Sequence, residues 1–403
     1  MHGIHSIPSI VILSAVSLAC LTAQTRRASD AEVDRVHRSA LLIDTHNDVT
    51  SETVKGLDIG PLRQQGHTDL VRLKQGGVGA VFFAAYVSGT YAQGNRAANR
   101  AMEMIDTIRH DIVGRHPTDF ELALTADGIA AARKKGRIAA LIGIEGGHAI
   151  EDSLRLLRNF HALGVRYMTL THNNSNHWAD SAGDANKPNN GLSGFGREVV
   201  REMNRLGMMV DISHASDKTF YDVLEASTVP PFASHSSCRS LANIPRNMTD
   251  AMITALGKKG GLVQINFGCE FLNQKSAETS TWANPKIAEG LRQRANAQAA
   301  GEKARAELLK KLTSEADAKM ARATLEDAVA HIDRVVKLAG IDTVGIGSDY
   351  DGVGCVPVGL EDVSKFPALT RALLEKGYSP ADVHKIYGGN LLRLMREAEK
   401  AAR

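Results

Sequence analysis

The sequence predicts a (β/α)8 barrel, in which a ring of eight parallel strands is surrounded by helices. Three observations support this fold class: eight short apolar runs recur along the chain, segments with helical periodicity separate most of them, and six runs end in a residue that can bind a metal ion. Continuous apolar runs are typical of parallel strands that are buried on both faces. The loops after the strands of such a barrel converge on one end, where catalytic groups collect.

The eight strands are expected at 41–44, 79–87, 139–144, 167–171, 208–212, 231–234, 261–267 and 343–347. Helices are expected at 31–42, 95–110, 151–163, 195–206, 217–226, 250–258, 325–339, 379–386 and 390–400. Apolar residues recur there at the three- and four-residue spacing of a helix face. The segment 173–196 is rich in Asn, Gly, Ser and Asp, and we expect a long loop that forms part of the site.

One segment interrupts the regular alternation of strands and helices. Residues 270–324 follow the seventh predicted strand, and within them 287–320 predict one or two solvated helices broken near Gly301. We interpret this segment as a surface insertion with an ordinary charged face. A lid over the barrel mouth and a dimer contact are the alternatives. The sequence therefore predicts one barrel domain over 31–400 that carries a helical insertion over 270–324.

Residues 1–24 predict a leader rather than a part of the barrel. The run 8–24 is apolar and uncharged, it is followed by Arg26 and Arg27, and it is short and rich in small residues. These properties are typical of a secretory signal segment, here with cleavage near Ala23. We therefore expect export to the periplasm or the extracellular space. Lipid anchoring at Cys20 is an alternative, and a disordered or membrane-associated N-terminal helix is another.

The composition argues against a nucleic-acid-binding protein and excludes little else. The chain has 403 residues, 43% of them hydrophobic and 23% charged, which is ordinary for a soluble globular protein. The net charge is only +3 and no block of Lys and Arg stands out, so no nucleic-acid partner is expected. Beyond Cys20, the three cysteines Cys238, Cys269 and Cys355 give an odd number. We expect partly buried thiols rather than a disulfide framework.

Side chains at the ends of the strands predict a site for two metal ions. His46 and Asp48 are two positions apart after the first strand, so both can bind one ion. His214 and His235 end the fifth and sixth strands, which are neighbours in a barrel, and can bind a second ion. Glu145 ends the third strand, and its two oxygens can bridge the ions. This set of His and carboxylate ligands suits zinc-class ions.

Catalytic roles are predicted for two further residues at strand ends. A pair of bridged ions lowers the pKa of a bound water from about 15.7 towards 7. Asp349, at the end of the eighth strand, is expected to orient that water and accept its proton, with Asp351 as the alternative acid. His172 is expected to donate a hydrogen bond to the oxyanion of a tetrahedral intermediate. A structural His bonded to the Asn-rich loop is the alternative. Candidates for orienting the ligands are Asp44, Asn47 and Asp211.

Seven motifs are spread over residues 41–396. They are DTHND (44–48), IEGGHAI (144–150), RYMTLTHNNSNHWADS (166–181), GLSGFGREVVREMNRLGMMVDISH (191–214), SHSS (234–237), PRNMTD (245–250) and GSDYDGV (347–353). Together they resemble the membrane (renal-type) dipeptidases, the zinc peptidase family M19 among the amidohydrolase-like barrels. The resemblance implies a binuclear zinc dipeptidase with two Zn²⁺ per chain, active on dipeptides that include those with a C-terminal D-residue. It also implies a homodimer.

The resemblance carries residue roles to matching positions. His46 and Asp48 would bind the first zinc, His214 and His235 the second, and Glu145 would bridge them; His172 would contact the scissile carbonyl, and Asp349 would shuttle the proton. Arg246 in the PRN segment would bind the C-terminal carboxylate of the substrate, and the bidentate geometry of a guanidinium fits that role.

The chain also departs from the family pattern. Mammalian members carry a Cys where this chain has Asn174, so that disulfide is absent, and the charged segment 393–403 does not resemble a lipid-anchor signal. The insertion puts the substrate preference and the dimer contacts in doubt. The first alternative function is another hydrolase on this barrel, with a lactone, amide or β-lactam substrate. Such barrels usually open with His-x-His and use a carboxylated Lys, whereas this chain has His46-x-Asp48 and Glu145. A non-catalytic exported binding protein is the second alternative.

Overall fold

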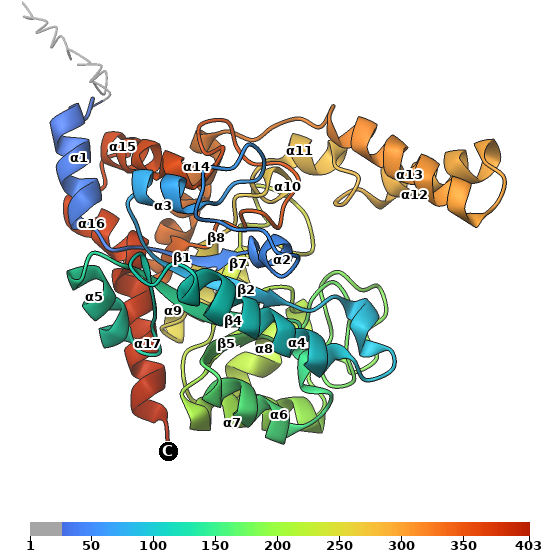
Figure 1. The fold of residues 1–403 in the computed structure, drawn as a ribbon, viewed down its shortest axis with the longest axis horizontal. Helices are drawn as coiled ribbons and strands as arrows, with labels where there is room; N and C mark the ends of the chain where they lie inside the picture. The colour runs from blue at the N-terminus through green and yellow to red at the C-terminus, as the bar shows by residue number, and fades with distance from the viewer. Residues whose placement is uncertain (1–25) are drawn as a thin grey trace, which may run out of the picture.

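Eight parallel strands form a ring at the centre of the molecule in the computed structural model, which describes residues 26–403 (Figure 1). Around the ring they are β1 (Leu42–Asn47), β2 (Val78–Tyr86), β4 (Ile138–Glu145), β5 (Val165–Thr169), β6 (Met209–Asp211), β7 (Phe232–Ser236), β8 (Leu262–Ile265) and β9 (Val344–Ile346). The predicted (β/α)8 barrel is confirmed. A ninth strand, β3 (Phe120–Leu122), pairs in parallel with the start of β4 outside the ring. Its three residues are too few to show a periodic pattern.

The ring is nearly closed, and its seam lies between β1 and β9. Asn47, at the end of β1, forms an isolated parallel bridge with Tyr350, which follows β9 in the chain. The amide of Asp48 donates to the carbonyl of Tyr350 at 2.9 Å, and the amide of Asp349 donates to the carbonyl of His46 at 3.0 Å. The seam is therefore joined at the carboxyl ends of the strands, by the backbone of predicted site residues.

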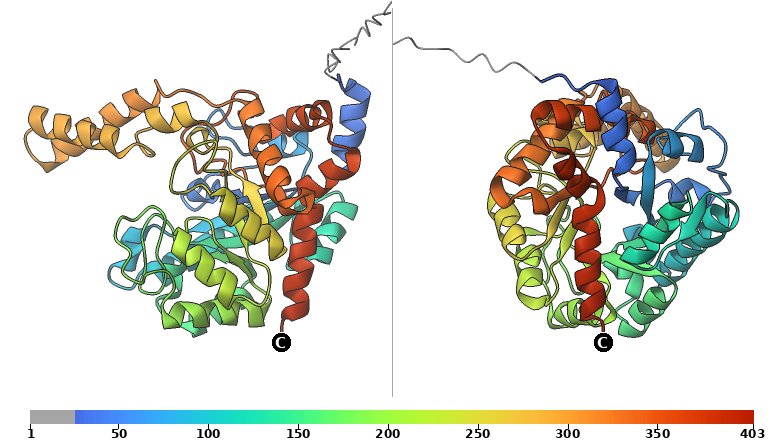
Figure 2. Two further views of the ribbon diagram at one scale, coloured as in Figure 1. Left: turned by 180° about the vertical axis from the view of Figure 1, so that it is seen from behind. Right: turned by 90° about the vertical axis from the view of Figure 1, so that its left-hand side faces the viewer.

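Helices surround the ring, and most of those expected from periodicity are present (Figures 1 and 2). The longer ones are α1 (Asp30–Ser39), α4 (Ala97–Asp106), α5 (Ala126–Lys134), α6 (Leu154–Ala162), α7 (Gly194–Leu206), α8 (Asp217–Ala226), α9 (Asp250–Lys258), α14 (Leu325–Ala339), α15 (Phe366–Lys376) and α17 (Asn390–Ala401). The shorter ones are α2 (Thr50–Thr53), α3 (Leu70–Gln75) and α16 (Pro380–His384). Sequence analysis missed α5 and α15 among the longer helices, and α2 and α3 among the shorter ones. It also started α6 too early, because the side chain of Ser153 caps that helix by accepting from the Leu156 amide.

The C-terminal helix closes one end of the barrel. Apolar side chains of α17, among them Leu394 and Met395, pack in one cluster with Met209, Phe232 and Leu262, which begin β6, β7 and β8. Figure 2 shows α17 running across the barrel in the view from its left-hand side. The amino-terminal end is thus filled, and the carboxyl-terminal end is left for the site.

The insertion after β8 contains two short helices and a projecting hairpin. It comprises α10 (Cys269–Leu272), α11 (Gln274–Thr279), α12 (Pro285–Gln298) and α13 (Glu302–Asp317). Helices α12 and α13 extend away from the barrel (Figure 1), and their buried side chains are Ala295 and Leu312. The predicted break is confirmed, because Gly301 lies between the two helices with a φ of 85°.

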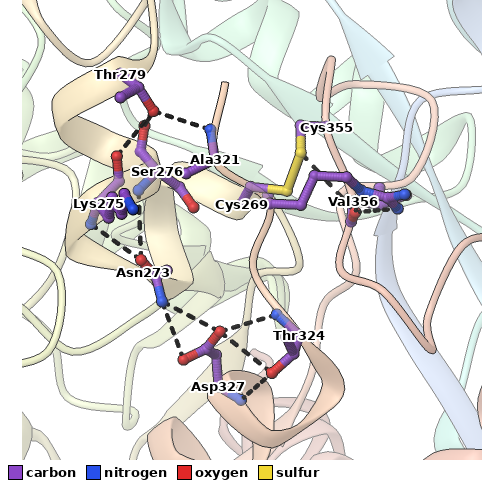
Figure 3. Close-up of a disulfide and its surroundings, with 12 residues drawn as sticks. Cys269, Asn273, Lys275, Ser276, Thr279, Ala321, Thr324, Asp327, Cys355 and Val356 are labelled. Atoms are coloured by element: carbon purple, nitrogen blue, oxygen red, sulfur yellow. Dashed lines mark hydrogen bonds between the residues drawn. A yellow bond between two sulfur atoms is a disulfide. The ribbon is translucent and has the colours of Figure 1, made fainter. Parts of the chain in front are cut away.

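The cysteine prediction was wrong for two of the three residues. Cys269, at the start of α10, forms a disulfide with Cys355 in the loop after β9 (Figure 3). The two residues are 86 positions apart, so spacing gave no sign of the pairing. The amide of Cys269 also donates to the carbonyl of Cys355 at 3.0 Å. Cys238 remains a buried free thiol, and burial raises its pKa to about 12.

Removing this disulfide should lower the free energy of unfolding. Replacing both Cys269 and Cys355 by Ser should cost about 2–4 kcal/mol, because the bond restricts a long loop of the unfolded chain. Urea unfolding of the double variant and of the wild type, each with and without a reducing agent, measures the effect. The reductant should shift only the wild-type midpoint, and a wild-type midpoint that it leaves unchanged would contradict the prediction.

None of the helices within residues 26–403 is both long and apolar enough to cross a membrane. The predicted leader at 1–24, with Cys20, lies outside the described residues, so export and lipid anchoring stay predictions.

Candidate active site

The carboxylate of Glu145 lies among four histidines at the carboxyl end of the ring. Its Oε1 is 2.9 Å from Nε2 of His214, 3.3 Å from that of His235 and 3.8 Å from that of His172. Its Oε2 is 3.7 Å from Nε2 of His46. The two oxygens thus face two different sets of nitrogens, which is the disposition that a bridging ligand requires.

Two more carboxylates lie on the His46 side of this cluster. Nε2 of His46 is 3.2 Å from Oδ2 of Asp48, and one ligand atom from each of His46, Asp48 and Asp349 lies within 4.8 Å of the others. With Glu145, three acids therefore share one buried site. Buried like charges at this spacing repel, so the arrangement is stable as a set of anions only when cations are bound between them.

The histidines are suited to binding such cations. Burial lowers the pKa values of His214 and His235 well below the usual value, so both rings are neutral and can offer a lone pair. Nε2 of His46 has no hydrogen-bond partner in residues 26–403. Nitrogen and carboxylate ligands in these numbers fit zinc-class ions, so the residues present fit the predicted metal pair.

A hydrogen-bond relay orients His235. The hydroxyl of Ser234 donates to Oδ2 of Asp211 at 2.6 Å, and Nδ1 of His235 lies 2.7 Å from the same hydroxyl oxygen. In this network Nδ1–H donates to Ser234, which leaves the lone pair of Nε2 directed at Glu145. Asp211 was predicted for this role. Ser234 was missed, although it stands next to His235 in the sequence.

A tyrosine inside the barrel orients His46 in the same way. The hydroxyl of Tyr167 donates to the carbonyl of Thr45 at 3.1 Å and lies 2.9 Å from Nδ1 of His46. The ring needs a glycine beside it, because a Cβ on Gly143 would lie 2.0 Å from Cζ of Tyr167. Sequence analysis missed Tyr167 because it interpreted residues 167–171 only as a strand of the barrel wall.

Breaking the Ser234 relay should weaken metal binding. In Ser234→Ala, His235 loses the partner that fixes its tautomer, so the affinity for a zinc-class ion should fall about 10–100-fold. Competition with a chromogenic chelator measures this affinity. Ser237→Ala is the matched control, since Ser237 is buried nearby but bonds to the carbonyl of Asn266. Equal affinities for the two variants would contradict the relay.

Asp349 is held beside the metal ligands by its neighbours. Its Oδ2 accepts from Nδ2 of Asn266 at 2.7 Å, and the preceding Ser348 donates through its amide and hydroxyl to Asp44 at 2.8 and 2.6 Å. Burial raises the pKa of Asp349 well above its usual value. Asn266 was missed because the predicted seventh strand, 261–267, contained it, whereas β8 ends at Ile265.

Asp351, the alternative acid, is bound through one oxygen only. Its Oδ1 accepts from the amide of His67 at 2.9 Å and lies 3.5 Å from Nη1 of Arg63, whereas its Oδ2 has no hydrogen-bond partner within residues 26–403. Both acids line the pocket, but Asp349, unlike Asp351, lies close enough to His46 and Asp48 to share a metal ion with them. The predicted helper Asn47 donates to the hydroxyl of Thr68 at 2.9 Å rather than to a ligand.

The backbone adopts uncommon conformations at two predicted site residues. His214 and Asp349 have φ values of 65° and 61°, in the left-handed region that side chains other than glycine rarely occupy. Such strain persists only where the surroundings impose it, and it clusters at functional sites.

A pocket of about 380 Å³ opens above the cluster. Arg246 lines it while remaining buried, and its Nη2 donates to the carbonyl of His235 at 3.2 Å. Its Nε–H has no partner in residues 26–403. Burial lowers the pKa of Arg246 to about 10, so it stays charged at neutral pH and can bind an anion. His172 lines the same pocket, with 17% of its side chain exposed.

Comparison with known proteins agrees with this geometry. The family model of the membrane dipeptidases, peptidase family M19, matches residues 30–403. The dipeptidase verJ of Clonostachys rogersoniana is 36% identical over 377 residues, which cover 90% of this chain and 85% of that protein. An uncharacterised dipeptidase of Schizosaccharomyces pombe is 33% identical over 385 residues, which cover 91% and 82% of the two chains.

Solved structures show the same fold. The probable dipeptidase PvdM of Pseudomonas aeruginosa superposes with a TM-score of 0.81 at 25% identity, covering 92% of this chain and 98% of that one. A metallopeptidase of Rhodobacter sphaeroides, solved with a phosphinate mimic of the dipeptide L-Ala-D-Ala, gives a TM-score of 0.71 at 25% identity, covering 89% and 99%. The chain therefore belongs to the membrane dipeptidases of peptidase family M19 and is a metallo-dipeptidase.

Proposed function

We propose that this protein hydrolyses dipeptides, including those with a C-terminal D-residue, with two Zn²⁺ ions held by His46, Asp48, Glu145, His214 and His235. The observation that carries the proposal is the position of Glu145, whose two oxygens face His46 on one side and the pair His214 and His235 on the other. The R. sphaeroides relative, solved with a mimic of L-Ala-D-Ala, supports the acceptance of a D-residue.

The residues around the ions have separate roles in the reaction. Two zinc ions, when bound, supply an activated water and polarise the scissile carbonyl. Asp349, whose carboxylate is oriented by Asn266, accepts the proton of the attacking water and passes it to the leaving amine. His172 is neutral because burial lowers its pKa, and its ring N–H donates to the oxyanion that develops.

Substrate length is set by the distance between Arg246 and the ions. The guanidinium is fixed by the carbonyl of His235 and the hydroxyl of Ser236, so it cannot follow a longer substrate. A dipeptide carboxylate bound there places its only peptide bond over the metal ligands. A tripeptide bound in the same way would place its second peptide bond at the same point and would need room for one more residue at its amino end.

Amine release from a panel of substrates tests this function. Purified protein is stripped of metal, reloaded with zinc, and given L,L and L,D dipeptides, tripeptides and C-terminally amidated dipeptides. Zinc-dependent cleavage of free dipeptides alone is the expected result. Cleavage of lactones or β-lactams without cleavage of any dipeptide would overturn the proposal in favour of another hydrolase of this barrel type.

A further inference from the structure

The insertion contributes one wall of the substrate pocket. The rings of Phe271 and Trp282 are stacked with centroids 5.3 Å apart and planes 20° apart, and both residues line the pocket. The guanidinium of Arg246 lies over the Phe271 ring, 5.2 Å from its centroid. The three side chains thus form a layered stack that begins at the predicted carboxylate anchor and ends at Trp282, which is 45% exposed.

Glu270 stands beside this stack and has no function in the mechanism above. Its side chain lines the pocket, yet the residue is only 6% exposed. Its Oε2 has no hydrogen-bond partner within the part of the chain that the structure describes. Burial raises its pKa to about 7, and the charge of Asp317 adds to the shift. A buried carboxyl oxygen without a partner costs stability, so its presence in a pocket wall calls for a ligand.

This wall is fixed to the catalytic groups. The amide of Gly268 donates to Oδ1 of Asn266 at 2.6 Å, and the same Asn266 holds Asp349. On the other side, the disulfide between Cys269 and Cys355 ties the start of α10 to the loop after β9. The backbone that carries Glu270 is therefore held in place before substrate arrives, which reduces the entropy lost on binding.

We propose that Glu270, with Phe271 and Trp282, forms a subsite for a positively charged side chain on the C-terminal residue of the dipeptide. The inference rests on the proposed function, because Arg246 then holds the carboxylate of that residue against Phe271. With the carboxylate held there, the side chain of the same residue is expected to extend along the wall that Glu270, Phe271 and Trp282 form. A lysine or arginine fits its chemistry, since the carboxylate pairs with the cation while the aromatic faces cover the hydrocarbon stem and attract the charge.

Two substrates that differ only in charge test the subsite. The value of kcat/KM is measured with zinc-loaded protein for alanyl-lysine and alanyl-norleucine, each in L,L and L,D forms. Norleucine keeps the stem of lysine and lacks the ammonium group. The wild type should prefer lysine by on the order of tenfold or more, as expected for a hydrogen bond to a charged group. Glu270→Gln should reduce that ratio to about 1, because the amide keeps the shape and loses the charge.

Glu307→Gln provides the control, since it removes the same charge from the exposed outer face of α13 and should leave the ratio unchanged. The wild-type ratio alone decides the question if Glu270→Gln fails to fold. Cleavage of both substrates without a lysine preference would overturn the subsite and leave the dipeptidase function standing. If neither substrate is cleaved, affinities for phosphinate dipeptide mimics with lysine or norleucine side chains are compared. Equal affinities overturn the subsite, and no binding of either mimic overturns both proposals.

Discussion

Glu145→Gln is expected to lose metal binding and dipeptide hydrolysis together. The amide of the Gln side chain has nearly the same shape as the Glu carboxylate but no charge. Only its oxygen can coordinate a metal ion, whereas both oxygens of the carboxylate can. Loss of a group that merely orients a ligand costs about 10–100-fold in metal affinity. Glu145 faces both sets of histidines, so its replacement should reduce the affinity for each ion by more than that factor.

Metal content after dialysis and kcat/KM for a free dipeptide are the two measurements for this variant. Glu198→Gln is the matched control, because Glu198 is an exposed acid on α7 far along the chain from any predicted ligand. A Glu145→Gln protein that retained two metals per chain and normal turnover would remove Glu145 from the bridging position.

Arg246→Ala is expected to keep its metals and to lose most of its affinity for free dipeptides. Removing one partner of a buried charge pair costs about 2–5 kcal/mol, which corresponds to roughly 30- to 5,000-fold in kcat/KM. The loss should appear mainly as a higher KM, since the carboxylate is bound in the ground state and in the transition state alike. Arg246→Lys should recover only part of it, because an ammonium group lacks the bidentate geometry.

Substrates without a free carboxylate separate this role from a structural one. A C-terminally amidated dipeptide has no group for Arg246 to bind, so the variant should cleave it about as well as the wild type does. Metal content is measured alongside, because Arg246 also donates to the carbonyl of the predicted ligand His235. An unchanged KM for free dipeptides would exclude Arg246 from the substrate site.

The sequence could predict the barrel and most of the residues in the cluster because one geometric rule governs both. Strand ends converge in a parallel barrel, so polar residues after apolar runs, such as Glu145 and Asp349, had to lie close together. A misplaced strand end hid one residue from this rule. The predicted strand 261–267 contained Asn266, but β8 ends at Ile265, and the side chain of Asn266 donates to Asp349.

Other features depend on contacts that no local pattern encodes. The disulfide joins Cys269 and Cys355 across 86 positions, and cysteine spacing does not determine such a pairing. The wall formed by Glu270, Phe271 and Trp282 belongs to the insertion, whose composition favoured a solvated surface and left a lid over the barrel mouth only as an alternative. Tyr167 points into the barrel, and only the three-dimensional packing shows that its hydroxyl reaches His46.

Hydrogen bonds at the base of the insertion divide it into two parts, a base that tolerates little change and a hairpin, α12 and α13, that tolerates much. Side-chain bonds join Asn273 to Asp327, Thr279 to the amide of Ala321, and Thr281 to Asp317 (Figure 3 shows the first two). Beyond these bonds, the hairpin acts as a long connection between two fixed points. Lengthening such a connection costs little free energy. We therefore expect that α12 and α13 can be shortened without a change in chemistry. A fusion partner or an affinity tag can be spliced into the tip at Gly301, whereas Glu270, Phe271 and Trp282 line the pocket and have to be kept.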